Sequence, residues 1–122
     1  MVELVEECKL GISVKEIQGV LKAVARRAVA LGLKDPAPLV IYVYCKSPPK
    51  GLIEVSRGVL VGEGVVAIRG NVLPNLAYEE LILGFISLSL LETFGTVDRK
   101  YAESFTKTHY LSIVREALWG AE

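Results

Sequence analysis

The sequence has few of the residues that build metal and nucleophile sites. Its 122 residues include one histidine and two cysteines. A closed zinc site needs four ligands, and one imidazole with two separated thiols does not supply them within one chain. Cys8 and Cys45 are also too few and too far apart for a disulfide framework, so we expect them to act as small core residues with reduced thiols. The sequence therefore predicts no metal and no cofactor.

An excess of charge of one sign is also missing. Fourteen basic and fourteen acidic residues cancel, and no run of like charges occurs. Because binding to phosphates depends on a basic patch, nucleic acid is a poor candidate as a partner. No basic stretch follows Met1, and the most apolar run, residues 81–91, is far shorter than the roughly 20 residues that a membrane span needs. We expect a cytoplasmic protein without a membrane segment.

Apolar residues, in contrast, are abundant. They make up 52% of the chain, which is short enough to favour a single domain over residues 1–122. A domain of this size has a high surface-to-volume ratio, so part of its apolar surface is expected to meet a partner. A second copy of the same chain is the simplest such partner, and the sequence therefore predicts a homo-oligomer or a complex with another protein.

A helix is predicted near the N-terminus, after residues 2–10, which fit either a short helix or an edge strand. Ser13 and Glu16 have the spacing of a capping box, and Gly32 supplies a left-handed end. The apolar residues between them follow steps of three and four, which is typical of one buried helix face. This predicted face consists of Val14, Ile17, Leu21, Val24, Ala28 and Leu31.

Short strands are predicted in the middle of the chain. Residues 39–45 are apolar on both faces and of strand length, which places them centrally in a sheet. Residues 52–56, 59–61 and 65–69 also have strand composition. The last two are joined by the turn Gly62-Glu63-Gly64, which suits a hairpin.

Two further helices are predicted at the C-terminal end. The first begins after Asn75 as N-cap and ends near Phe94 at Gly95; it is apolar nearly all round, with Gly84 allowing a close neighbour. The second is capped by Thr96 and runs to about Trp119, with one face formed by Ala102, Phe105, His109, Ile113 and Ala117. The predicted fold class is α+β: a leading helix, a small sheet of about four strands with a hairpin, and two C-terminal helices.

Catalytic candidates are few and carry no motif. His109 has apolar neighbours one turn away on each side, so a core histidine is the simpler interpretation; an acid–base pair with Glu92 or Asp98 is the alternative. Glu79 and Glu80 stand at a predicted helix start, where negative charge complements the helix dipole. The dipole role is the simpler interpretation for this pair.

The order of elements resembles the minimal zincin layout of SprT-like metallopeptidases. The resemblance covers residues 13–115 and includes the segments "GVVAIRGNVLPN" and "YEELILGFISLSLLE". In that family an edge strand precedes a helix with H-E-x-x-H, whose histidines bind zinc and whose glutamate activates water. The aligned positions here, near Ser87, Leu88 and Leu91, cannot bind zinc or act as a base. The resemblance therefore implies a zincin-like fold without the metal, either a pseudoenzyme or a domain with a binding role.

Two hypotheses about function follow. The first is a non-catalytic domain that acts through protein contacts, with Val114, Leu118 and Trp119 as the predicted interface, because a large aromatic residue close to a chain end anchors either its own core or a neighbour. The alternative is a small enzyme without a motif, using Glu92, Asp98 and His109. An enzyme is expected to have a concave pocket with convergent polar groups, and a contact domain a flat apolar patch.

Overall fold

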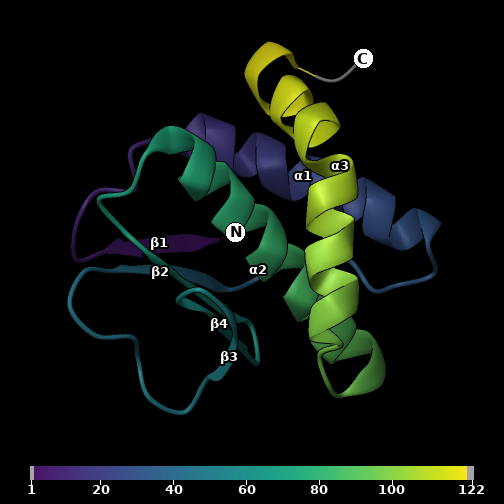
Figure 1. The fold of residues 1–122 in the computed structure, drawn as a ribbon, viewed down its shortest axis with the longest axis horizontal. Coiled ribbons are helices and arrows are strands. Elements are labelled where there is room, and N and C mark those ends of the chain that lie inside the picture. The colour runs from purple at the N-terminus through teal and green to yellow at the C-terminus, as the bar shows by residue number, and fades with distance from the viewer. Residues whose placement is uncertain (1, 121–122) are drawn as a thin grey trace.

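The structure, a computed structural model, describes residues 2–120 and has the predicted α+β class, with five strands where about four were expected (Figure 1). The additional strand precedes the leading helix. In chain order the elements are β1 (Glu3–Glu6), α1 (Val14–Ala30), β2 (Val40–Tyr44), β3 (Ile53–Ser56), β4 (Val59–Gly62), β5 (Val65–Arg69), α2 (Pro74–Phe94) and α3 (Arg99–Trp119).

The five strands form one mixed sheet in the order β1-β2-β5-β4-β3. β1, the segment that fitted either a helix or an edge strand, is an edge strand parallel to β2, and α1 is the crossover between them. β2 also pairs in parallel with β5, whereas β3, β4 and β5 are joined by two antiparallel hairpins. The predicted interior position of residues 39–45 is confirmed, since β2 lies between β1 and β5.

The main core lies between one face of the sheet and the helices. Alternate residues of β2 separate the two faces, as the period of a strand requires: Ile41 and Val43 belong to the main core, while Tyr44 belongs to a small cluster with Leu60 and Ala67. α2 packs against β4 and β5 on one side and against α1 and α3 on the other, and Figure 1 shows α3 crossing the other two helices. α2 is thus the central element.

α1 begins as predicted but presents a rotated face. Ser13 and Glu16 form the capping box, with both reciprocal hydrogen bonds present. Val14 and Leu31 of the predicted stripe are 55% and 53% exposed, whereas Val20 and Ala23 are buried. The cause is that α1 packs against both α2 and α3. The contact with α3 shifts the buried face of α1 toward that helix.

The N-caps of the two C-terminal helices differ from the prediction. α2 starts at Pro74, with Leu73 at the N-cap and no side-chain cap, so Asn75 lies inside the first turn. The fixed φ of proline suits the first helical position, which moves the start forward. α3 is capped by Asp98, which accepts a hydrogen bond from the backbone N–H of Tyr101, and not by Thr96. The predicted end at Gly95 is confirmed, with φ of 76°.

Gly84 allows α2 to approach the sheet closely, as predicted. A Cβ atom at this position would lie 2.5 Å from Cγ1 of Val66 on β5 and 3.4 Å from Cγ1 of Val59 on β4. The first distance is well below van der Waals contact, so any larger side chain forces Val66 or the surrounding backbone to move.

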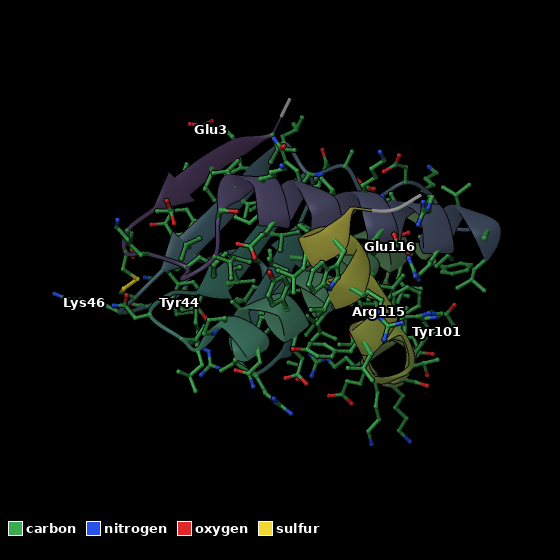
Figure 2. The ribbon with its side chains drawn as sticks, turned by 90° about the horizontal axis from the view of Figure 1, so that it is seen from above. Glu3, Tyr44, Lys46, Tyr101, Arg115 and Glu116 are labelled. Carbon is green, nitrogen blue, oxygen red and sulfur yellow. A yellow bond between two sulfur atoms is a disulfide. The ribbon has the colours of Figure 1, made fainter. Side chains whose placement is uncertain are left out.

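The expectation that both cysteines are free is wrong. Cys8 and Cys45 form a disulfide, with Cα atoms 6.0 Å apart (Figure 2). The parallel pairing of Glu6 with Val43 explains it, because each cysteine follows its paired residue by two positions. The disulfide therefore links two residues that are 37 positions apart in the sequence, one at each end of the β1–α1–β2 crossover. The predicted cytoplasmic location rested partly on reduced thiols and loses that support.

Between residues 2 and 120, no helix is both long and apolar enough to cross a membrane.

Candidate functional site

A cleft of about 510 Å³ opens between the β3–β4 turn and the first halves of α2 and α3. Nearly all of its lining side chains are polar, and Leu83 is the single apolar one. The lining residues are Ser56, Arg57, Glu79, Glu80, Leu83, Glu103, Ser104, Thr106 and Lys107.

Glu80 is the buried charged residue of this cleft. Its side chain is on the sheet side of α2, and only 1% of the residue is exposed. Arg69, at the end of β5, donates two hydrogen bonds to Oε2 of Glu80, from Nη2 at 2.5 Å and from Nε at 3.1 Å. Within residues 2–120, Oε1 has no hydrogen-bond partner. An unsatisfied buried acceptor of this kind costs about 1–3 kcal/mol or more.

Burial and the ion pair with Arg69 shift the pKa of Glu80 in opposite directions. Burial raises the pKa of its carboxyl, whereas the hydrogen bond and charge of Arg69 lower it, and burial is the stronger effect. Glu80 therefore holds a proton more tightly than an exposed glutamate does, although it contacts a guanidinium. A perturbed carboxyl group at the wall of a cleft is a typical feature of functional sites.

The β3–β4 turn positions a cation at the rim. Arg57 and Gly58 form a two-residue hairpin turn, with φ of 42° and 83°, and the left-handed conformation of Arg57 is unusual for a residue with a side chain. Arg57 pairs with Glu79 at 2.8 Å, but both side chains are largely exposed. The pair therefore stabilises the fold little.

Ser56, next to Arg57, joins the turn to α3: its Oγ donates to Glu103 at 3.3 Å, and Lys107 lies one turn farther along that helix. Three carboxylates thus face the cleft, from Glu79, Glu80 and Glu103. Across the described part of the chain, however, no three histidine, cysteine, aspartate or glutamate side chains converge closely enough to hold a metal ion. The glutamates of the cleft are spread around its wall.

The predicted acid–base residues do not come together. Asp98 caps α3, and His109 lies eleven residues later on the same helix; at about 1.5 Å per residue the two are roughly 16 Å apart along the axis. Glu92 is near the end of α2, where burial raises its pKa, Lys34 lowers it and Asp35 raises it. None of the three residues lines the cleft.

His109 packs as a core-edge residue. Its ring lies 4.4 Å from the ring of Phe105, centroid to centroid, one turn earlier. Burial lowers the pKa of the imidazole, and the positive charge of Arg27 lowers it further. Both effects favour the neutral imidazole, which is the form expected of a core histidine.

The predicted interface residues occupy the last turns of α3. Val114 is half-buried against the core, while Leu118 and Trp119 are 51% and 78% exposed. Leu111, two turns before Leu118, is 75% exposed, and it was not among the predicted interface residues. Its heptad spacing from Leu118 is the sequence signal that identifies it.

For Glu79 and Glu80 the sequence favoured a role with the helix dipole, but α2 begins at Pro74 and has no acidic residue in its first turn, so both lie too far along the helix for that role. The signal that separates Glu80 from Glu79 is helical phase. Glu80 lies three residues after Ala77 and four before Gly84, both buried against the core, so it shares their face. Glu79 points away from this face and is partly exposed.

Comparison of the chain with models of protein families, with curated proteins and with solved structures gives no match. The function therefore has to be inferred from the residues themselves.

Proposed function

We propose that the protein is a non-catalytic domain that acts through protein contacts and that its partner is a second copy of the same chain. The observation that carries this proposal is the exposure of Trp119. This residue is 78% exposed, although a tryptophan is the side chain that gains most from burial at an interface. Leu118 and Leu111 extend the apolar surface along the same helix.

The arrangement of these residues suits a two-fold axis. Leu111 and Leu118 lie two helical turns apart on one face of α3. If two copies of α3 pack antiparallel, Leu111 of each copy meets Leu118 and Trp119 of the other, which is the self-complementary pattern of an isologous dimer. Arg115 lies between the two leucines, and its long side chain can extend to the rim of such an interface.

The end of α3 is held firmly enough to serve as a contact surface. Glu116, labelled in Figure 2, accepts hydrogen bonds from Arg26 and Arg27 of α1, the latter at 2.6 Å. One residue later, Ala117 packs against Gly19, where an added Cβ would lie 2.9 Å from Cα of Ala117. A helix end that is tied down in this way keeps its exposed side chains in fixed positions, which reduces the entropy lost on association.

A zincin-like pseudoenzyme is compatible with this proposal. The positions that the resemblance aligns with the metal motif are apolar or unable to ligate zinc, and Ser87 and Leu88 are fully buried in the core of α2. The alternative of an enzyme based on Glu92, Asp98 and His109 has no support from geometry, since the three do not share a cleft. The polar cleft around Glu80 is the concave feature expected of an enzyme, but none of the three predicted acid–base residues lines it, so we retain a contact domain as the proposed function.

The test uses Trp119 as its own reporter, because it is the single tryptophan of the chain. We expect its fluorescence emission to shift to shorter wavelength as protein concentration rises, in parallel with the dimer fraction from analytical ultracentrifugation. Trp119→Ala should weaken dimerisation by about 2 kcal/mol or more, roughly 30-fold in Kd, and leave the monomer folded.

Phe94→Ala is the matched control. Phe94 is also a large aromatic residue, 65% exposed, but it lies before the start of α3, roughly 30 Å from the other end of that helix. Its removal should leave the dimer unchanged. A wild-type chain that stays monomeric at high concentration, with Trp119 emission constant, would contradict the proposal.

A further inference from the structure

We infer that the disulfide between Cys8 and Cys45 is a redox-sensitive lock. A dithiol reductant opens it at Cys45, and β1 then detaches from the edge of the sheet. The inference is independent of the proposed dimer, because the disulfide joins the ends of β1 and β2, whereas the dimer contact uses residues 111–119 of α3.

The two sulfur atoms have different surroundings. Cys8 is half-buried, and its Sγ packs so closely on Gly70 that an added Cβ atom at residue 70 would overlap it. Cys45 is exposed, and Figure 2 shows the disulfide at the outer edge of the molecule. Exposed disulfides are reduced more easily than buried ones. An external thiolate therefore attacks Sγ of Cys45, and Cys8 is the leaving group.

The reduction has two steps. A thiolate of the reductant first forms a bond to Sγ of Cys45, the original sulfur–sulfur bond breaks, and Cys8 leaves as a thiolate that solvent protonates. The second thiolate of the reductant then attacks its own sulfur in the mixed disulfide and releases Cys45. Nδ2 of Asn71 donates to Sγ of Cys45 at 3.4 Å and stabilises the charge that develops there. The protein gains two electrons and two protons, and the dithiol loses them as it becomes a disulfide.

β1 depends on this lock because its other contacts are weak. Its four residues are exposed or half-buried, and it lies at the edge of the sheet beside β2. Beyond β1, the side chain of Glu7 accepts hydrogen bonds from the hydroxyl of Tyr42 and the backbone N–H of Cys45, and both bonds are exposed to solvent. An edge strand with few buried apolar contacts and exposed hydrogen bonds opens at a low cost in free energy.

The opening ends at Lys9. The carbonyl oxygen of Lys9 accepts a hydrogen bond from the backbone N–H of Asn71 at 2.7 Å, and Leu10 is fully buried in the main core. α1, α2, α3 and the other four strands keep their contacts. β2 is left with an unpaired edge of β-branched and aromatic residues, and an edge of this kind promotes association with other strands. The oxidised lock keeps that edge covered.

The experiment compares backbone hydrogen exchange of the full chain with and without dithiothreitol, in the absence of denaturant. Alkylation of thiols and mass spectrometry measure how much of the protein is reduced. The N–H groups of Glu3 and Glu7 donate to the carbonyls of Leu39 and Val43, and we expect their exchange to become roughly tenfold faster or more on reduction. In the reduced protein, the amide of Val66 in the buried strand β5 should stay strongly protected.

Two variants separate the lock from the neighbouring hydrogen bonds. The double variant Cys8→Ser, Cys45→Ser should show the fast exchange of reduced wild type, with no response to dithiothreitol. Tyr42→Phe is the matched control, because it removes a hydrogen bond to Glu7 and leaves the disulfide intact. Its β1 amides should stay protected in the oxidised protein.

Three results would overturn the inference: a disulfide that dithiothreitol reduces only in denaturant, β1 amides that stay equally protected after reduction, or a loss of protection at Val66 together with β1. The last result would mean that reduction unfolds the whole domain. The comparison of oxidised and reduced wild type decides the matter even if the double variant does not fold. Failure of the dimer test would leave this inference untouched, because different residues carry it.

Discussion

The helices α2 and α3 have the same length of 21 residues but opposite surroundings. Thirteen residues of α2 are buried and only four of α3, because α2 lies between the sheet and the other helices while α3 covers them from outside. Each helix contains a residue that does not fit its surroundings: the buried Glu80 in α2 and the exposed Trp119 in α3. Such exceptions to the local pattern mark the candidate sites, since a protein keeps them at a cost in stability.

The contrast between a central α2 and a peripheral α3 would be wrong if the two helices contributed equally to stability. Phe85 of α2 is fully buried, so Phe85→Ala should lower the free energy of unfolding by about 3–5 kcal/mol. Leu111 of α3 is 75% exposed, so Leu111→Ala should change it by about 0.5 kcal/mol or less. Chemical denaturation of dilute, monomeric protein measures both. Equal effects would mean that α2 is not the central helix.

Substitutions that enlarge a side chain test the same difference in burial between α2 and α3. Gly84→Leu should destabilise the fold by about 1–3 kcal/mol or more, since even a Cβ atom overlaps Val66. Thr108→Leu enlarges an exposed residue of α3 and should be within about 0.5 kcal/mol of wild type. A Gly84→Leu protein with an unchanged melting temperature would show that the contact between α2 and the sheet is loose.

The smallest predicted effect concerns the start of α2 and its response to acid. The hydroxyl of Tyr78 donates to Glu16, and this hydrogen bond lowers the pKa of Glu16, assisted by the bond to the Ser13 backbone. A carboxyl whose pKa is lowered on folding stabilises the fold above its ordinary value of 4.5. That contribution is lost as pH falls through the folded pKa.

Tyr78→Phe should therefore reduce the loss of stability between pH 5 and pH 3, by about 1 kcal/mol or less. Melting temperatures of the variant and the wild type across this range measure the difference. Tyr101→Phe serves as the control, because the described residues contain no hydrogen-bond partner for the Tyr101 hydroxyl. Parallel pH curves for wild type and Tyr78→Phe would show that the bond to Glu16 does not affect folding.

Much of the fold could be predicted because it depends on local signals. The capping box of Ser13 and Glu16, the glycine at the end of α2 and the β-branched run of β2 each act within a few residues, and all three are present in the structure. The N-caps were predicted less well, because Pro74 takes the first helical position ahead of Asn75, and because Asp98 competes with Thr96, a residue of similar capping ability.

The disulfide and the cleft could not be predicted because both depend on how distant elements meet. Cys8 and Cys45 come together only through the parallel register of β1 and β2. Glu80 of α2 pairs with Arg69 from β5, and it lines the cleft together with Glu103 from α3. A single sequence indicates helices and strands but not which of their faces converge. The candidate site therefore required the three-dimensional arrangement.

The disulfide also changes how the chain carries mechanical load. Cys8 and Cys45 close a covalent ring that contains the whole of α1 and β2, with β1 outside it. A force that pulls the two ends of the chain apart passes through the sulfur–sulfur bond and never reaches the residues inside the ring. The fully stretched chain is then shorter by roughly 120 Å than its reduced form, and α1 cannot be unravelled from either end.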